Sequence, residues 1–531
     1  MNAETVKYGL FLTHGVETFI LLVIPIGGRT AGSFYSRAYL KGGDAIMIQP
    51  SFTQTSSVAM RILTEGQIAE IVDAAFEIVE TVGCLMADEK ARSMLKRKGA
   101  IIRDDRVKIP RHLVQQALKT VPRGFTIYNR QGERAMILEG RRSYFGTSTG
   151  SPNTLDPING KVRPTTLDDI VRGALIADAL PNIDFVMPMG SASDVTPALA
   201  QEVHEFEAMV THTIKPIVML SYSNRAFRRV YEMAAAIAGG WAALREKPFL
   251  LAYPEPITPL VFPKDGTERM MLVAKWGLPQ VFGPVVQLGA TGPVTMAGAL
   301  AQVFAESFIC LTLVQLIHPG APCFLSANIA GFDMQHGTIS PGAPETSLGM
   351  AACAEIAHHF GLPSWGVAGS TDAKTLDAQA GAESAFGIIT QALAGVSLIH
   401  DVGYMDGSMI CGPEMLVLGD EVIGMARRFL RGITVNQETL QRNLIAKICP
   451  GGNYLQENHT ASAFRQELWM PSLMTRERYS TWKDGGKRSI RHRIVEKIEA
   501  ILETHEPIPL SGSIIEKIEK IRQMADSELT K

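Results

Sequence analysis

Short apolar runs alternate with longer amphipathic stretches between about residues 165 and 435. The strand-like runs lie at 185–187, 216–220, 249–253, 280–286, 322–326, 364–368 and 396–400. The helix-like stretches include 199–212, 225–243, 265–276, 293–317, 346–360 and 380–394. This alternation predicts an α/β fold with parallel strands and right-handed crossovers. About seven such units favour a (β/α)₈ TIM barrel over an open sheet, with the eighth strand expected at 144–147 or at 453–455.

The segments on either side of this region have a different pattern. We expect residues 47–164 to form a helical and hairpin lead-in packed on the barrel, residues 165–460 the barrel itself, and residues 461–531 a cover of C-terminal helices. Thr64 stands three residues before Gln67, a spacing typical of a capping box at the start of a helix.

The first 46 residues look unlike the rest. Their apolar run, 19–26 (FILLVIPI), is shorter than the roughly 20 residues that cross a membrane and lacks the basic start of a signal peptide. Normal folded-protein patterning begins after Met47. We therefore expect residues 1–46 to be a non-native or disordered extension, with a hydrophobic anchor as the alternative.

The net charge, the cysteines and the histidine spacing give no support to several classes of protein. The formal net charge is −2, which gives no support to nucleic-acid or membrane-surface binding. The six cysteines form no CxxC pair, and scattered thiols in a large chain predict a reducing, cytoplasmic setting. The His and Glu residues do not fall at zinc-ligand spacings such as HExxH, so no metal held by side chains alone is expected.

The loops that follow the expected strands are rich in glycine and small polar residues. In a TIM barrel the functional residues lie on these loops. The most distinctive is 362–383 (LPSWGVAGSTDAKTLDAQAGAE), where a strand-like run ends at Gly369-Ser370, a polar loop follows, and a helix-like run begins near Gly381.

Several of these loops carry a family resemblance. They are 144–150 (YFGTSTG), 283–292 (GPVVQLGATG), 342–345 (GAPE), 361–364 (GLPS), 368–374 (AGSTDAK) and 377–381 (DAQAG). In this order they resemble the trimethylamine methyltransferase family, from about residue 60 to the C-terminus. The resemblance implies a TIM barrel, methyl transfer from an amine, and a corrinoid (cobalamin) acceptor held by a cognate corrinoid protein, with no tightly bound cofactor of the chain's own.

One departure bears on the substrate. The founding trimethylamine enzymes carry pyrrolysine just before the Asp-Ala-Lys element, where this chain has Ser370-Thr371. Trimethylamine is therefore the less expected substrate. The resemblance to pyrrolysine-free relatives implies a quaternary amine such as glycine betaine.

The candidate site residues follow from that chemistry. An N-trimethyl head attracts aromatic faces and carboxylates, which favours Tyr144, Tyr253 and Tyr404 beside polar loops. Asp372 could face the ammonium and Lys374 a substrate carboxylate, or the two could form a structural clamp; Glu345 is a site carboxylate or a helix cap. The remaining candidates for substrate binding are Gln287, Thr291, His336, Ser370, Thr371 and His459. His400, at the end of an apolar strand, reads as a satisfied core histidine.

Two other functions remain open from the sequence. One is a Schiff-base lyase or aldolase that uses Lys374, which would require a desolvated amine with a lowered pKa. The other is a non-catalytic barrel that binds betaine-like solutes. The amphipathic C-terminal helices suit a homo-oligomer in either case.

Overall fold

The computed structural model describes residues 38–39, 45–46, 58–157 and 159–530. The chain divides into two compact units, Met1–Thr55 and Ser56–Lys531. In the first unit, β1 (Ala38–Tyr39) and β2 (Ala45–Ile46) pair antiparallel. Apart from these two strands, the expected extension 1–46 and its apolar run 19–26 lie outside the described residues.

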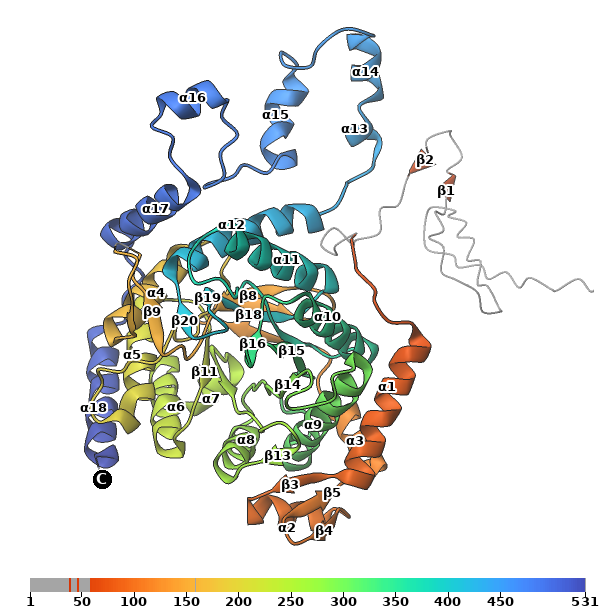
Figure 1. Ribbon diagram of the computed structural model, residues 1–531, viewed down its shortest axis with the longest axis vertical. Coiled ribbons are helices and arrows are strands. Elements are labelled where there is room, and N and C mark those ends of the chain that lie inside the picture. Colours follow the sequence, from red (N-terminus) through yellow and green to blue (C-terminus); the bar gives the residue numbers. More distant parts are fainter. Residues whose placement is uncertain (1–37, 40–44, 47–57, 158, 531) are drawn as a thin grey trace, which may run out of the picture. The chain divides into compact units, whose positions relative to one another are not determined.

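The second unit is an α/β fold in which helices surround short parallel strands (Figure 1). The parallel strands are β8 (Tyr144–Thr147), β11 (Ile217–Leu220), β12 (Leu250–Tyr253), β14 (Val285–Gln287), β17 (Trp365–Val367) and β18 (Leu398–Val402), with β15 (Asn328–Asp333) beside β14. β18 pairs with both β17 and β8, and β11 pairs with β12. Of the two candidates for the eighth strand, 144–147 is thus a strand beside β18, whereas 453–455 lies in no strand.

Isolated parallel bridges connect these pairs. They join Gly146 to Phe185, Val186 to Ile217, Ala252 to Gln280, and Gln280 to Cys323. A backbone hydrogen bond of 3.0 Å then runs from Leu325 N to the Pro363 carbonyl, just before β17. The runs predicted as strands at 185–187, 280–286 and 322–326 therefore take part mainly through single bridges rather than long ladders.

The helices predicted by the 3.6-residue period are present. They are α5 (Gln201–His212), α6 (Asn224–Ala238), α8 (Lys264–Trp276), α9 (Met296–Ile317), α10 (Pro344–His359) and α11 (Ala378–Ala394), and the predicted stretch 225–243 divides between α6 and a further helix, α7 (Trp241–Glu246). Two more helices, α4 (Leu167–Ala179) and α12 (Pro413–Leu430), precede and follow this series. Local sequence fixes where several begin: the Asp377 side chain accepts from Ala380 N at the start of α11, and Pro344 and Pro413 stand at first helical positions. Within the described part of the chain, α9 alone is long and apolar enough to cross a membrane, but 83% of its most apolar window is buried.

The segment before β8 contains helices and small antiparallel pairs. Its elements are α1 (Glu65–Glu77), β3 (Cys84–Met86), α2 (Glu89–Arg97), β4 (Ile101–Arg103), β5 (Arg106–Lys108), α3 (Arg111–Thr120), β6 (Phe125–Tyr128) and β7 (Arg134–Leu138). The capping box predicted for Thr64 and Gln67 is present at the start of α1, and α1 and α3 pack on α9.

Side chains on one face of the parallel strands form a separate hydrophobic cluster. Its strand members are Phe185, Met187, Val218, Leu251, Tyr253, Val281, Phe324, Trp365 and Leu398, and the β6–β7 hairpin adds Ile127, Met136 and Leu138. The opposite face of the strands packs against the helices in two larger clusters. We call the face that carries the smaller cluster the inner face.

The C-terminal segment covers the helices and also projects from them. α17 (Ile490–Thr504) packs on α4 and α12, and α18 (Gly512–Leu529) runs beside α5 and α6 (Figure 1). These two helices match the predicted amphipathic stretches. Between α12 and α17 lie four short helices, α13 (Gln437–Leu440), α14 (Arg442–Ile448), α15 (Asn458–Glu467) and α16 (Tyr479–Asp484), which have no buried residue.

Candidate functional site

The inner face changes from apolar to polar at the carboxyl ends of the strands. Because side chains alternate along a strand, the residue two positions after an inner-face residue continues that face. Leu398 is followed in this way by His400, Tyr253 by Glu255, and Phe324 by Ser326 and then Asn328. Polar side chains from separate strands therefore converge at one end of the strands, which we call the mouth.

Three aromatic rings lie together just below this polar layer. Trp365 stacks on His400, with ring centroids 4.4 Å apart and an interplanar angle of 21°. Tyr253 meets both rings edge-on, at centroid distances of 5.1 Å from Trp365 and 5.8 Å from His400. All three side chains are buried, so their π-systems face an environment with little water.

Glu255 stands two residues after Tyr253 and is a carboxylate of this cluster's surroundings. Burial raises the pKa of the Glu255 carboxyl to about 7, although the hydroxyl of Tyr253 and the nearby His400 act in the opposite direction. Gly283 makes room for the pair: a Cβ there would lie 2.3 Å from the Tyr253 hydroxyl and 2.5 Å from Glu255 Oε1. A side chain at position 283 would therefore displace both groups.

Asp401, which directly follows His400, is a second buried carboxylate beside the aromatic rings. His400 Nδ1 lies 2.6 Å from Asp401 Oδ1, but the orientation does not suit a hydrogen bond, and both atoms are buried without one. Asp401 has a positive φ of 79° and stands at the register shift between β18 and β8. Such backbone strain in a non-glycine residue often accompanies a functional position.

Other buried polar atoms at the mouth also lack protein partners. Among the described residues, the hydroxyls of Ser148 and Ser326, both polar atoms of the Asn328 side chain and both ring nitrogens of His400 make no hydrogen bond. A buried polar group left unpaired costs about 1–3 kcal/mol. This set of unpaired donors and acceptors therefore points to a polar ligand at the mouth.

A cavity of about 320 Å³ opens at Thr149, the residue after Ser148. It is lined in part by Thr149, Glu202, Glu205 and Tyr222, which follow β8 or precede and follow β11. Burial raises the pKa of the Glu205 carboxyl to about 7, against hydrogen bonds from Ala192 N at 2.8 Å and Gln201 Nε2 at 2.7 Å. The cavity therefore has carboxylates and a tyrosine ring in its wall, a composition suited to a cation.

The loop after β17 is held by the carboxylate of Glu383, a residue of α11. Thr371 and the backbone N–H of Asp372 donate to Glu383 Oε2 at 2.6 Å and 2.8 Å. Burial raises the pKa of Asp372, although the Ser340 hydroxyl donates to it and favours the charged form. Ser370 and Thr371 are buried, and Asp372 is half-buried.

Lys374 lies at the surface of the same loop. Its ammonium donates to the Asp372 carbonyl at 2.6 Å and lies 3.3 Å from Asp406. Its side chain is 68% exposed, so it is not desolvated as a Schiff-base lysine would require. It contacts the backbone of Asp372 rather than its carboxylate, so the expected side-chain clamp does not form.

The remaining predicted residues are spread over the molecule. Tyr253 lies in the aromatic cluster, and Tyr404 is buried just after β18. Tyr144 begins β8 at the other end of the strands and donates to the Ile137 carbonyl at 3.3 Å. Gln287 and Thr291 close a turn, where the Gln287 N–H donates to Thr291 Oγ1 at 2.9 Å.

Three further predicted residues face solvent. His336 lies in the turn between β15 and β16 (Thr338–Ser340), 3.1 Å from Asp333. Glu345 stands exposed in the first turn of α10 without a capping hydrogen bond, and His459 is exposed on α15. The structure does not bring these three together with the cluster at the mouth.

His400 is a core histidine as expected, but it is not satisfied by hydrogen bonds: Nδ1 lies 2.6 Å from Asp401 Oδ1, and neither ring nitrogen makes a hydrogen bond within the described chain. Glu255, Asp401, Ser326 and Asn328 were also missed as site residues. A polar residue two positions after an inner apolar residue of a strand is the sequence pattern that could have identified them.

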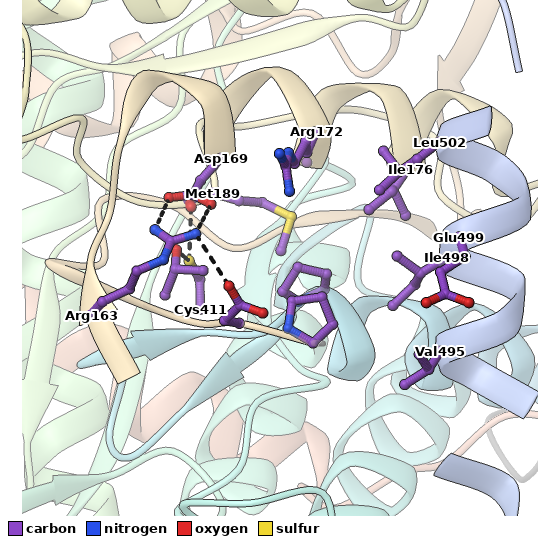
Figure 2. A pocket seen from close by; sticks show the side chains of 15 residues that line it. Arg163, Asp169, Arg172, Ile176, Met189, Cys411, Val495, Ile498, Glu499 and Leu502 are labelled. Atoms are coloured by element: carbon purple, nitrogen blue, oxygen red, sulfur yellow. Dashed lines mark hydrogen bonds and ion pairs between the residues drawn. The ribbon is translucent and has the colours of Figure 1, made fainter. Parts of the chain in front are cut away.

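A smaller pocket lies away from the mouth, between α4 and α17 (Figure 2). Arg163 there holds Asp169 through two hydrogen bonds of 2.6 Å and 2.8 Å, and Ile176, Val495 and Ile498 form an apolar wall. Arg163 and Asp169 therefore satisfy each other, and Arg172 lies 2.7 Å from Asp168. Among the described residues, no three His, Cys, Asp or Glu side chains lie together as a metal site.

Known proteins are similar in sequence to this chain along nearly its whole length. The family described as trimethylamine methyltransferase (MTTB) matches residues 36–526. A glycine betaine methyltransferase of Desulfitobacterium hafniense is 29% identical over 86% of this chain and 95% of its own. A trimethylamine methyltransferase, MttB, of the same species is 28% identical over 91% of this chain and 97% of its own.

Among solved structures, the monomethylamine methyltransferase of Methanosarcina barkeri aligns over 88% of this chain and 94% of its own, at 12% identity and a TM-score of 0.44. The family match alone covers more than nine-tenths of the sequence. The chain belongs to the trimethylamine methyltransferase family and is a methyltransferase.

Proposed function

We propose that this protein moves a methyl group from a quaternary amine such as glycine betaine to the Co(I) of a corrinoid held by a separate protein. A quaternary nitrogen already carries its positive charge, so its methyl group can be transferred without prior protonation, leaving a neutral tertiary amine. The corrinoid would supply the nucleophile. The tasks left to this chain are to bind the cation, orient one N–CH₃ bond and exclude water.

One observation carries the substrate class: buried aromatic rings and acidic side chains meet at the mouth. The rings of Trp365, Tyr253 and His400 lie within 6 Å of one another, and Glu255 and Asp401 stand beside them. An N-trimethyl group has no hydrogen-bond donor, and each aromatic face attracts it by about 0.5–2 kcal/mol. These groups therefore suit a quaternary ammonium.

The unpaired donors at the mouth support a substrate that also carries a carboxylate. The hydroxyls of Ser148 and Ser326 and the amide of Asn328 lack partners within the described chain. A carboxylate accepts hydrogen bonds from such groups, whereas the hydroxyl of choline offers less. This favours a betaine over choline, and the glycine betaine methyltransferase among the relatives supports the same substrate.

We further infer that the parallel pairings close into a (β/α)₈ barrel. The bridges and hydrogen bonds lead from β8 through the strand-like runs to β17, and β18 pairs with β17 on one side and β8 on the other. The inner-face cluster and the β6–β7 hairpin would then fill the barrel and close its far end. The mouth would be the face where TIM barrels carry their active sites.

The rim of the mouth fits a protein partner. Successive loops each expose one large apolar side chain: Leu199, Tyr222, Ile257, Val294, Met334 and Met409. Exposed apolar groups gathered around a site are typical of a docking surface. They support a corrinoid protein as the macromolecule that faces the mouth.

A direct test is to mix the protein with chemically reduced cob(I)alamin and a panel of methylated amines. Loss of the Co(I) absorbance with a quaternary amine, and none with trimethylamine, would support the proposal. Absorbance loss with trimethylamine alone would refute the substrate assignment. Binding of a betaine without any turnover, with either free or protein-held corrinoid, would favour the binding-protein alternative.

A further inference from the structure

A second space opens at the carboxyl ends of the strands, next to the aromatic rings. It is the cavity of about 320 Å³ that begins at Thr149. Leu220 in its wall pairs in register with Tyr253 of β12, but none of the three clustered rings is among the residues that line it. The cavity and the ring cluster are therefore neighbouring compartments with different walls.

Tyr222 brings one aromatic ring to the cavity wall. It comes two residues after Leu220, so it continues the inner face of β11. Its hydroxyl lies near Gly150, where a Cβ would be 3.7 Å away. The ring therefore reaches from the end of β11 to the loop after β8. A ligand in the cavity meets this ring and several oxygen atoms, whereas the mouth offers a cluster of three rings.

The hydroxyl of Thr149 is one of these oxygen atoms. Thr149 is only 8% exposed, and its hydroxyl has no hydrogen-bond partner among the described residues. Buried polar side chains in proteins nearly always have a partner. The unpaired hydroxyl in the cavity wall therefore indicates a polar ligand, independently of the acidic side chains nearby.

The carboxyl group of Glu205 provides a second free oxygen. Glu205 is 4% exposed, and its Oε1 accepts from Ala192 N at 2.8 Å and from Gln201 Nε2 at 2.7 Å. Both bonds go to Oε1, which leaves Oε2 without a donor in the described part of the chain. Because Glu205 lines the cavity, Oε2 is available to a hydrogen-bond donor on a ligand.

The neighbouring Glu202 is occupied instead by the loop after β11. The Ser221 hydroxyl donates to its Oε2, and Ser223 N donates to its Oε1 at 3.0 Å. Arg269 on α8 favours the charged form of Glu202, and the Glu202 charge in turn favours the protonated form of Glu205. Of the two carboxyl groups, Glu205 is therefore the one with an oxygen and a proton to offer.

We propose that this cavity holds the tertiary amine formed by methyl transfer, as an ammonium whose N–H donates to Glu205 Oε2. The amine is a product only under the function proposed above, on which this inference rests. A quaternary ammonium has no N–H and suits the three rings, whereas a tertiary ammonium has one N–H and suits an oxygen acceptor. The two compartments therefore differ in the same way as substrate and product.

Glu205 also accounts for the proton of that ammonium. When the methyl group leaves for the acceptor, the electron pair of the broken N–CH₃ bond stays on nitrogen, and the amine is neutral. The acid form of Glu205 passes its proton to this lone pair, which leaves a carboxylate beside an ammonium. An alkylamine holds a proton more strongly than a carboxyl group whose pKa is about 7. The carboxylate regains a proton from water after the product leaves.

Isothermal titration calorimetry of the full chain at pH 7, without corrinoid, tests this site. The ligands are dimethylglycine and glycine betaine, in two buffers of different ionisation enthalpy, so that proton release is counted. Binding of dimethylglycine ammonium should displace the proton of Glu205, about half a proton per site at a pH equal to its pKa. Glu205→Gln should lose this release and bind dimethylglycine at least about tenfold more weakly, while its response to glycine betaine stays within about twofold of the wild type.

Two further variants separate the site from its surroundings. Thr149→Val removes the unpaired hydroxyl at nearly constant volume, and should weaken dimethylglycine binding but not glycine betaine binding. The matched control is Glu207→Gln, the same substitution on α5, where the side chain pairs with Arg522 of α18 at 2.7 Å. It should match the wild type with both ligands. Circular dichroism melts check that all four proteins are folded.

Three results would overturn the proposal. They are a wild type that does not bind dimethylglycine, a Glu205→Gln variant that binds it as tightly as the wild type, and an equal loss of both ligands in that variant, which would place Glu205 in the substrate site. Failure of every protein to bind glycine betaine, with the dimethylglycine results as expected, would count against the proposed substrate but would still support the tertiary-ammonium site.

Discussion

The indole of Trp365 stacks on the imidazole of His400 with ring centroids 4.4 Å apart. The two residues come from neighbouring strands, β17 and β18, and Tyr253 meets both from β12. Beside them stand Glu255 and Asp401. If these groups recognise the positive charge of the substrate, the binding affinity should depend on the charged nitrogen and not only on the shape of the molecule.

That dependence can be measured with a ligand pair. Glycine betaine and 3,3-dimethylbutanoate have the same shape and the same carboxylate, but carbon replaces the charged nitrogen in the second. We expect glycine betaine to bind at least about tenfold more tightly, about 1.4 kcal/mol, by isothermal titration calorimetry. Equal affinities would mean that the aromatic and acidic groups do not recognise the ammonium.

Gly283→Ala should impair the site. The new Cβ would lie 2.3 Å from the Tyr253 hydroxyl and 2.5 Å from Glu255 Oε1, so both groups must move. We expect kcat/KM for the quaternary amine to fall by about tenfold or more. The matched control is Gly381→Ala, since a Cβ at Gly381 has no contact within 4 Å, and its activity should equal that of the wild type.

Glu255 should give the reaction a pH dependence. Burial places its pKa at about 7, and a cationic substrate binds the ionised form better. The value of kcat/KM, which reports the free enzyme, should therefore fall by up to about tenfold per pH unit below pH 7. Glu255→Gln should lower kcat/KM at pH 8 and flatten this limb. A variant that keeps the wild-type profile would exclude Glu255 as its origin.

Lys374 should be dispensable. Its ammonium is exposed and paired with Asp406 at 3.3 Å, so it is poorly placed to act as a nucleophile. We expect Lys374→Met to retain methyl transfer within about twofold, a surface effect of less than 0.5 kcal/mol. Covalent trapping of a carbonyl compound on Lys374 by borohydride would instead favour the lyase alternative.

Glu205 should lower stability at high pH. Its pKa rises from 4.5 to about 7 through burial, so the folded state binds the proton more tightly than the unfolded chain. Stability therefore falls as pH rises from about 4.5 to 7. Glu205→Gln keeps both hydrogen bonds without the charge, and should gain about 1–3 kcal/mol at pH 8 but little at pH 5. Urea unfolding at both pH values checks this; an equal gain at both would contradict it.

The alternation of strands and helices could be predicted because each element has its own period. The capping box at Thr64 and the helix start at Asp377 follow from local sequence. The runs 280–286 and 322–326 form few ladder bonds, and prolines contribute to this: Pro284 and Pro322 have no N–H to donate. A run of apolar residues does not reveal such gaps.

The site was harder to predict, because a strand buried on both faces is apolar throughout and does not show which face is inner. Tyr253 was predicted from its position before a polar loop, and the structure places it beside Trp365 and His400. His400 was set aside because it ends an apolar run, and only the structure reveals that neither of its ring nitrogens makes a hydrogen bond within the described chain. His336 and Lys374 were predicted as site residues although their side chains are exposed, because the sequence alone does not show which polar residues are buried.

The most direct measurement of the central claim is the fate of the amine itself. Glycine betaine labelled with ¹³C in its methyl groups would be incubated with the protein and cob(I)alamin, and the products followed by NMR. Dimethylglycine should appear with the protein and not without it, in step with the loss of Co(I). If glycine betaine binds but no dimethylglycine forms, even with a corrinoid protein as acceptor, the assignment as a quaternary-amine methyltransferase is contradicted.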